Sequence, residues 1–297
     1  MRMKEDKASS TAYTVIHGML HTANNPLFSE LVDRETRDAC QKILTASPEG
    51  RMRLSQLDSP IKSKMLPFLE WLLLPGITLN YVLRKKFIEE KVLESLNSGV
   101  RQVVNIGAGF DTLAWRLSGK MPHVNFIEID HPATNREKVK ALFDDSRNSS
   151  NLHFISADLS KQNIRHVLET DGGFDPKRKT LYICEGVLMY LKKENVEALF
   201  DALKNLSGIG TAFIFSCMEP ADSPKNNIRP LLHLYLFIKN ERYNWYIREE
   251  KLPDFTKKHG FTVIETANSD DYRERYLGND KRLLLHQGEY LALTVAQ

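Results

Sequence analysis

The sequence predicts an α/β fold in which a mostly parallel sheet is covered by helices on both faces. From residue 102 onward, short apolar runs of strand length alternate with segments of helical periodicity. The first run ends in Gly107-Ala108-Gly109, a glycine-rich turn typical of a parallel strand that leads into a helix. Residues 1–100 have helical spacing throughout. We therefore expect an N-terminal helical cap over 1–100 and a core over 101–297, with a helical insertion at about 219–246.

The N-terminal part is expected to contain helices over 28–44 and 81–96, each with apolar residues at helical spacing. Between them, residues 66–74 are strongly apolar and rich in aromatic side chains. We favour packing of this stretch beneath the core. The alternative is that it lines a hydrophobic substrate pocket.

The core is expected to contain seven strands connected mostly by helices. The apolar runs predict strands at 102–106, 124–129, 152–156, 180–184, 212–216, 261–265 and 290–295. Helical periodicity predicts helices at 112–118, 133–143, 163–168, 194–206 and 248–259. Residues 271–282 are expected to form a helix or a loop before the last strand. The interruption at 219–246 is too long for a simple connection, which favours a helical flap over the site.

Composition narrows the class of protein. The 297 residues carry a net charge of +3 with no long basic block, so a nucleic-acid partner is not expected. The three cysteines form no CxxC pair, so neither a metal site nor a disulfide framework is expected. The apolar stretch at 65–83 is interrupted by charged residues and prolines, which makes it a poor membrane span. A soluble, cytoplasmic protein without a membrane partner is expected; the sequence does not indicate an oligomeric state.

Acidic residues follow three of the predicted strands. Asp130, Asp158 and Glu185 stand at the carboxyl ends of the second, third and fourth strands. Ligands of open α/β sheets bind at this edge, so the three acids should face the glycine turn. A carboxylate at position 130 suits a ribose diol because it accepts two hydroxyl hydrogen bonds. Asp158 stands where an adenine amino group could be received. The alternative for both aspartates is capping of the following helix or turn.

The residues of the glycine turn distinguish between two classes of nucleotide cofactor. Thr112 occupies the place of the third glycine in a dinucleotide-binding GxGxxG motif. Asp111 would also repel a pyrophosphate, whereas its charge suits a cofactor with a cationic part. The pattern therefore favours S-adenosylmethionine over a nicotinamide dinucleotide.

Four motifs in order resemble those of the leucine carboxyl methyltransferase family, which includes bacterial polyketide O-methyltransferases. They cover about residues 80–195 at the family's natural spacing. The motifs are Val104-Asn105-Ile106-Gly107-Ala108-Gly109-Phe110-Asp111-Thr112 with Ala114-Trp115-Arg116-Leu117, Glu128-Ile129-Asp130-His131-Pro132, Ala157-Asp158-Leu159, and Glu185-Gly186-Val187-Leu188-Met189-Tyr190-Leu191.

The resemblance implies a class I methyltransferase fold, with a seven-stranded sheet whose last strand is antiparallel. It implies that Gly107 and Gly109 approach the methionine part of the cofactor, with Ala108 between them among the cofactor-binding residues. Asp130 would hold the ribose, and Asp158 and Leu159 would flank the adenine. Glu185 would lie beside the cofactor near the fourth strand. Arg84 matches a family arginine that pairs with the cofactor carboxylate, as a planar guanidinium can in bidentate fashion. The alternative for Arg84 is a solvated charge on a helix.

These residues predict methyl transfer from S-adenosylmethionine to an oxygen of a hydrophobic small molecule. An ionised carboxylate acceptor needs no general base, and the sequence identifies no clear one, which favours a carboxylate over a hydroxyl. Tyr190 is the one candidate for a catalytic role, with aromatic packing as its alternative. Other readings are a methyltransferase of protein C-terminal carboxylates, a nicotinamide-dependent oxidoreductase, and a non-catalytic module that binds cofactor and partner.

Overall fold

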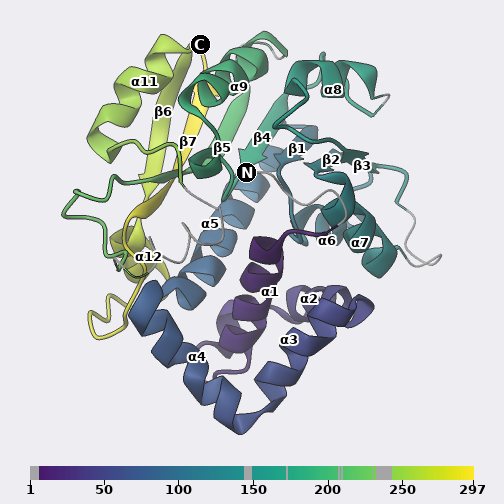
Figure 1. Ribbon diagram of the computed structural model, residues 1–297. Helices are drawn as coiled ribbons and strands as arrows, with labels where there is room; N and C mark the ends of the chain where they lie inside the picture. Colours follow the sequence, from purple (N-terminus) through teal and green to yellow (C-terminus); the bar gives the residue numbers. More distant parts are fainter. Residues whose placement is uncertain are drawn as a thin grey trace.

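A seven-stranded sheet forms the centre of the computed structural model (Figure 1), which describes residues 7–143, 149–171, 173–206, 208, 210–229, 231 and 243–297. The strands are β1 (Gln102–Ile106), β2 (Asn125–Asp130), β3 (Leu152–Ser156), β4 (Thr180–Cys184), β5 (Ala212–Met218), β6 (Phe261–Ala267) and β7 (Glu289–Ala296). Their order in the sheet is β3-β2-β1-β4-β5-β7-β6.

The pairing of these strands confirms the predicted topology. β1 to β5 are parallel, and β7 runs antiparallel between β5 and β6. All seven predicted strands are present, with ends that differ by at most two residues. Buried parallel strands consist almost entirely of apolar residues, so they could be identified from the sequence.

Helices cover both faces of the sheet. They are α5 (Ile77–Asn97), α6 (Leu113–Ser118), α7 (Pro132–Leu142) and α12 (Ser269–Tyr276) on one face, and α8 (Ile164–Thr170), α9 (Lys193–Leu206) and α11 (Leu252–Lys258) on the other. Side chains alternate along the strands between the two layers: Val103 packs with the first set of helices, and Val104 with the second. Two hydrophobic clusters thus sandwich the sheet.

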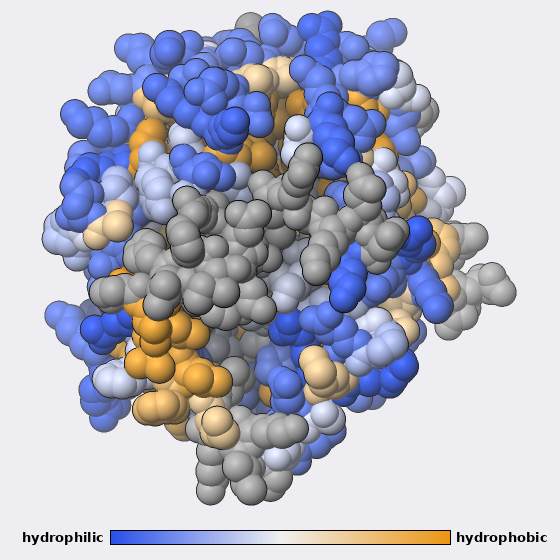
Figure 2. All heavy atoms as spheres, in the orientation of Figure 1, coloured by the Kyte–Doolittle hydropathy of each residue, from blue (hydrophilic) through white to orange (hydrophobic). Residues whose placement is uncertain are grey.

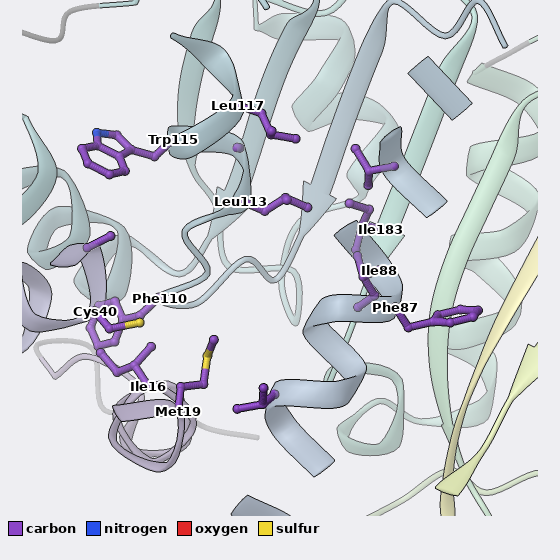
Figure 3. Packing of buried hydrophobic residues seen from close by; sticks show 14 of the residues in the cluster. Ile16, Met19, Cys40, Phe87, Ile88, Phe110, Leu113, Trp115, Leu117 and Ile183 are labelled. Atoms are coloured by element: carbon purple, nitrogen blue, oxygen red, sulfur yellow. The ribbon is translucent and has the colours of Figure 1, made fainter. Parts of the chain in front are cut away.

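The N-terminal helices extend the first cluster. These are α1 (Ser10–Ala23), α2 (Arg34–Ala46), α3 (Pro48–Asp58) and α4 (Pro60–Leu73), which lie at the bottom of Figure 1. Figure 3 shows Ile16 and Met19 of α1 close to Cys40 of α2, in the same cluster as Phe87 of α5 and Ile183 of β4. Burial of one such apolar side chain contributes about 1.5–3 kcal/mol. The N-terminal helices therefore pack on the sheet's own helices, with α1 against α5 and α2 against α7.

Two predicted helices differ from the structure. The helix predicted at 28–44 is a short 3-10 turn, η1 (Ser29–Leu31), followed by extended chain and then α2. Asp33 separates the two because its side chain caps α2, accepting a hydrogen bond from the Thr36 amide at 2.9 Å. The helix predicted at 248–259 begins as the 3-10 turn η4 (Glu249–Lys251) before α11. The 271–282 segment includes most of α12 and then turns.

The expectation that residues 66–74 pack beneath the core is wrong. Phe68 and Trp71 of α4 are 60 % and 54 % exposed, and Leu69 is also exposed. Figure 2 shows hydrophobic atoms gathered over this part of the surface. Leu74, just after α4, lines the cavity described below. Apolar composition predicted burial here, but it contains no information about whether a neighbouring element covers the helix.

Part of the predicted insertion can be compared with the structure. The described chain from 219 to 229 forms turns and extended segments, while 230 and 232–242 lie outside the described residues. The helical flap and the domain boundary near residue 100 therefore stay predictions. The three cysteines, Cys40, Cys184 and Cys217, are buried and free. Within the described parts of the chain, we find no helix long and apolar enough to cross a membrane.

Candidate functional site

A cavity of about 510 Å³ opens at the carboxyl ends of the parallel strands. This volume is within the range of sites that hold drug-sized ligands. The structure brings all ten sequence-predicted site residues to its wall: Arg84, Gly107, Ala108, Gly109, Asp111, Asp130, Asp158, Leu159, Glu185 and Tyr190. The predicted convergence of the glycine turn and the acidic strand ends is thus confirmed, since they face one cavity.

The glycine turn forms the floor of the cavity after β1. Gly107 and Gly109 have φ angles of +71° and +53°, which L side chains rarely adopt. The amides of Gly107 and Ala108 both donate to the carbonyl oxygen of Ile129, at 2.8 and 3.1 Å, which ties the turn to β2. A Cβ atom on Gly107 would lie under 3.0 Å from Cγ2 of Val187. Only glycine fits this position of the chain.

Asp130 connects the end of β2 to this turn. Its Oδ2 accepts a hydrogen bond from the Gly109 amide at 2.6 Å, and its Oδ1 accepts one from the His131 amide at 2.7 Å. Burial raises the pKa of Asp130, although these two hydrogen bonds oppose the shift. The side chain that caps α7 is His131, not Asp130. Each oxygen of Asp130 retains a further lone pair that can accept from a ligand.

Asp158 lies after β3 in a local turn. Its Oδ1 accepts hydrogen bonds from the Ser160 amide at 3.0 Å and the Ser160 hydroxyl at 2.6 Å. Burial opposes the charge, but these bonds and Lys161 hold the pKa of Asp158 below its usual value. The capping alternative therefore describes this geometry. The side chain also faces the cavity, where Leu159 lies beside it.

Charged side chains form a buried network at the other end of the cavity. The two terminal nitrogens of the Arg84 guanidinium pair with Glu185 and Glu289, and the ammonium of Lys85 pairs with Asp111 and Glu185. Arg84 is 4 % exposed, so the alternative that it is a solvated helix charge is wrong. Burial favours the neutral form of Glu185, but Arg84 and Lys85 outweigh it and lower its pKa. Burial raises the pKa of Glu289 despite Arg84.

Asp111 is held by this network and by the helix that follows the turn. Its Oδ1 accepts a hydrogen bond from the Leu113 amide at 2.6 Å, at the start of α6. Burial opposes its charge, but Lys85, Lys138 and this hydrogen bond lower the pKa of Asp111 to about 2. Asp111 is therefore ionised at neutral pH and already paired with Lys85.

Sequence reasoning did not assign a role to Lys85 or Glu289. Lys85 is adjacent to Arg84, and its place opposite Asp111 depends on how α5 lies against the turn. Glu289 reaches Arg84 because β7 inserts antiparallel between β5 and β6, about 200 residues away along the chain. The sequence shows only an acidic residue near the start of the last strand. Its pairing with Arg84 could be predicted only once the order of the strands in the sheet was known.

The C-terminal end of η3 (Leu188–Tyr190) contributes the candidate Tyr190. Its ring lies 5.4 Å from that of Tyr243, and the two phenols are hydrogen-bonded. Both line the cavity. Burial raises the pKa of Tyr243 well above its ordinary value, so this phenol is protonated at neutral pH.

Comparison with known sequences identifies a family. The sequence profile of the leucine carboxyl methyltransferase family matches residues 17–204. A Mycobacterium tuberculosis H37Rv protein, provisionally named as an S-adenosyl-L-methionine-dependent methyltransferase, is 28 % identical over 202 residues. The match covers 67 % of this chain and 54 % of that protein. A Mycobacterium marinum protein with the same kind of name is 26 % identical over 72 % of this chain and 64 % of its own length. The matched region thus spans between half and two thirds of these relatives.

Comparison with solved structures identifies the fold. A provisionally named methyltransferase from Thermobifida fusca superposes with a TM-score of 0.61 at 13 % identity, covering 99 % of this chain and 96 % of that one. The magnesium protoporphyrin IX methyltransferase of Synechocystis, solved with S-adenosylhomocysteine, gives a TM-score of 0.50 at 14 % identity, covering 75 % of this chain and 85 % of that one. The architecture is that of class I methyltransferases, and the first of these structures also spans the N-terminal helices.

Proposed function

Because the chain belongs to the leucine carboxyl methyltransferase family, we propose that it is an S-adenosylmethionine-dependent O-methyltransferase acting on a hydrophobic small molecule. One observation carries this proposal: the glycine turn and the acidic ends of β2, β3 and β4 face a single cavity of about 510 Å³. The printed names of the relatives, and the S-adenosylhomocysteine in the Synechocystis structure, support the choice of cofactor.

The residues present fit the nucleoside part of this cofactor. Asp130 accepts two backbone hydrogen bonds and retains lone pairs toward the cavity, which suits the two hydroxyls of a ribose. Asp158 and Leu159 lie after the neighbouring strand and would flank the adenine. Close approach of the methionine part to Gly107 is possible because this residue has no side chain. We assign these residues to cofactor binding.

The charges at the other end suit the methionine part. Asp111 and Glu185 are ionised and can attract its ammonium group and the sulfonium. Arg84 and Lys85 are the candidates for its carboxylate. Both terminal nitrogens of Arg84 are held by Glu185 and Glu289, whereas the Lys85 side chain is more exposed, at 18 %. We therefore propose that Arg84 acts together with Lys85, with Lys85 nearer the carboxylate.

The chemistry asks little of the protein beyond alignment. The cofactor, when bound, supplies a methyl group already activated by the positive sulfur. The walls of the cavity then have to hold an acceptor oxygen in line with that methyl and exclude water. Met189, Met218 and Tyr81 provide apolar and aromatic surface at this end. This lining supports a hydrophobic acceptor with either a carboxylate or a hydroxyl as its reacting group.

The test is methyl transfer from S-adenosylmethionine with an isotopic label on the methyl. Incubation with a panel of apolar carboxylic acids, phenols and alcohols should label at least one of them on oxygen. Mild base releases the label from an ester but not from an ether, so it identifies the acceptor group. Label on nitrogen, carbon or sulfur only would contradict O-methylation. Cofactor binding without any turnover would instead favour a non-catalytic module.

A further inference from the structure

One buried imidazole lies on the wall of the cavity without a hydrogen-bond partner. His286 is 1 % exposed and lines the cavity. Its Nδ1 is buried and makes no hydrogen bond, and among the described residues nothing pairs with its Nε2. A buried polar group without a partner costs free energy, so it either reflects a compromise of packing or serves a ligand.

The chain around His286 is held firmly although it is neither helix nor strand. The side chain of Asn227 bonds both neighbours: its Nδ2 donates to the Leu285 carbonyl at 3.1 Å, and its Oδ1 accepts from the Gln287 amide at 2.9 Å. On the other side, Gly76 lies so close to the Leu285 backbone that a Cβ there would come under 3.0 Å. The backbone on both sides of His286 is therefore held before any ligand binds.

Aromatic hydroxyl side chains share this end of the cavity with His286. Arg84 lies within electrostatic reach of both His286 and Tyr81, and Glu289 within reach of both Tyr81 and Tyr243. The cavity wall here is aromatic and apolar apart from the buried charges. Burial, with a smaller contribution from Arg84, lowers the pKa of His286 to about 3. The imidazole is thus neutral at physiological pH and can accept a hydrogen bond.

The balance of charge argues against an anionic acceptor. Among the described residues that line the cavity, acidic side chains outnumber basic ones by nine to four. At the end near His286 the cation is Arg84, and its terminal nitrogens are already paired with two carboxylates. A carboxylate acceptor would be repelled by this field, whereas a neutral hydroxyl would not.

We propose that this end of the cavity binds a neutral aromatic hydroxyl compound, a phenol, whose hydroxyl is hydrogen-bonded to His286. The inference rests on the proposed function and deepens it by choosing the hydroxyl over the carboxylate. His286 is then a catalytic residue, because it contacts the group that reacts.

The transfer balances without any further reactant. A lone pair of the phenol oxygen forms the new O–CH3 bond while the S–CH3 bond breaks, and the electron pair of that bond stays on sulfur. The hydroxyl proton passes to Nε2 of His286 and from there to solvent. One positive charge disappears from sulfur as one appears on the imidazole, so the buried site does not change its net charge. This exchange offsets the low basicity of the buried ring.

The experiment compares three probes that share a 4-hexylphenyl group: 4-hexylphenol, 4-hexyl-2-nitrophenol, which is largely ionised at pH 8, and 4-hexylbenzoic acid. The wild-type protein should methylate 4-hexylphenol. His286→Phe should lose about 100-fold or more of this rate, as expected for removal of a general base. The ionised nitrophenol is an anion, so wild type should methylate it more slowly than 4-hexylphenol. His286→Phe should lose less than about tenfold of that slower rate, because this acceptor needs no base. In calorimetry on protein loaded with S-adenosylhomocysteine, 4-hexylphenol should bind more weakly to His286→Phe than to wild type.

Two further variants separate chemistry from folding. His17→Phe replaces another buried histidine that has an unpaired ring nitrogen and does not line the cavity, so it should keep the wild-type rate. His286→Gln retains a polar side chain and should recover part of the binding of 4-hexylphenol. Thermal melting of all variants identifies any loss that comes from unfolding.

The outcomes are distinct. If the protein methylates 4-hexylbenzoic acid and neither phenol, the O-methyltransferase proposal stands and the assignment of a phenol is wrong. If His286→Phe methylates 4-hexylphenol as fast as wild type, the role of His286 is wrong. If S-adenosylhomocysteine does not bind, the proposed function fails first. If it binds and no probe is methylated, the phenol inference is overturned while cofactor binding remains.

Discussion

Replacement of Asp130 by alanine is the perturbation whose effect the structure defines best. Its two carboxylate oxygens hold the Gly109 and His131 amides at 2.6 and 2.7 Å. These bonds leave one lone pair on each oxygen for the ribose diol. Asp130→Ala removes both acceptors for the ligand and the hydrogen bond from Gly109 that connects Asp130 to the glycine turn, while the bonds of Gly107 and Ala108 to Ile129 remain. It should weaken cofactor binding without unfolding the protein.

The size of the effect follows from the number of hydrogen bonds lost. A hydrogen bond to a charged group contributes about 1.5–3 kcal/mol, so two ribose bonds at the low end amount to about 3 kcal/mol. This corresponds to roughly a 150-fold increase in the Kd for S-adenosylhomocysteine. Because Asp130 is only partly buried, water can reach the freed amides. The free energy of unfolding should then fall by only about 1–2 kcal/mol.

Calorimetric titration with S-adenosylhomocysteine measures the affinity, and urea denaturation measures the stability. Asp33→Ala is the matched control, because Asp33 also lines the cavity and accepts two hydrogen bonds, from the amide and hydroxyl of Thr36. It should lose about 1 kcal/mol of stability as a lost helix cap and bind the ligand within about threefold of wild type. A folded Asp130→Ala protein with unchanged affinity would refute the assignment of Asp130 to the ribose. Equal losses of affinity in Asp130→Ala and Asp33→Ala would show that the effect on binding is not specific to Asp130.

Three further predictions concern stability. Gly107→Ala should lower the free energy of unfolding, measured by urea denaturation, by about 2–4 kcal/mol, since it adds a steric clash to the strain of a positive φ. Gly186→Ala, at a similar φ of +72° with open space around it, should lower it by about 1–2 kcal/mol. Arg84→Gln should lower the free energy of unfolding by about 3–5 kcal/mol, because it leaves the buried Glu289 without its cation and Glu185 with Lys85 alone. If adding Glu289→Gln recovers none of this loss in guanidinium denaturation, the ion-pair explanation is wrong. The pKa of Asp111 in the folded protein, about 2, lies below its ordinary value of 3.8, so its ionised form stabilises the fold fully above pH 4, and about 2 kcal/mol of the free energy of unfolding is lost as the pH falls to 2. Asp111→Asn should remove this part of the pH dependence of the free energy of unfolding, measured by acid unfolding. An unchanged pH dependence would contradict the assignment.

Much of the fold could be predicted from the sequence, because buried parallel strands and amphipathic helices have distinct patterns of apolar residues. Both ends of β4 (Thr180–Cys184) were predicted correctly, since all five of its side chains are buried. The exposed face of α4 was not predicted. Phe68 and Trp71 are residue types typical of a core, but the arrangement of the neighbouring elements leaves both side chains exposed, with the Arg229 guanidinium over the Trp71 ring.

The site was predictable where it depends on local chain and not where it depends on distant contacts. Gly107 directly follows β1 and Asp130 is the last residue of β2, so the sheet topology brings them together. The pairing of Arg84 with Glu289 joins α5 to the start of β7, and no local pattern marks it. The same holds for His286, whose place on the cavity wall depends on contacts with Asn227.

Titration of the wild-type protein with S-adenosylhomocysteine, with NAD in a parallel experiment, asks directly whether the acid-rimmed cavity is an adenosyl-sulfonium site. One molecule of S-adenosylhomocysteine should bind per chain with micromolar or tighter affinity, and NAD should give no measurable heat. Tight binding of NAD, or no binding of S-adenosylhomocysteine by folded protein, would contradict the methyl-donor assignment.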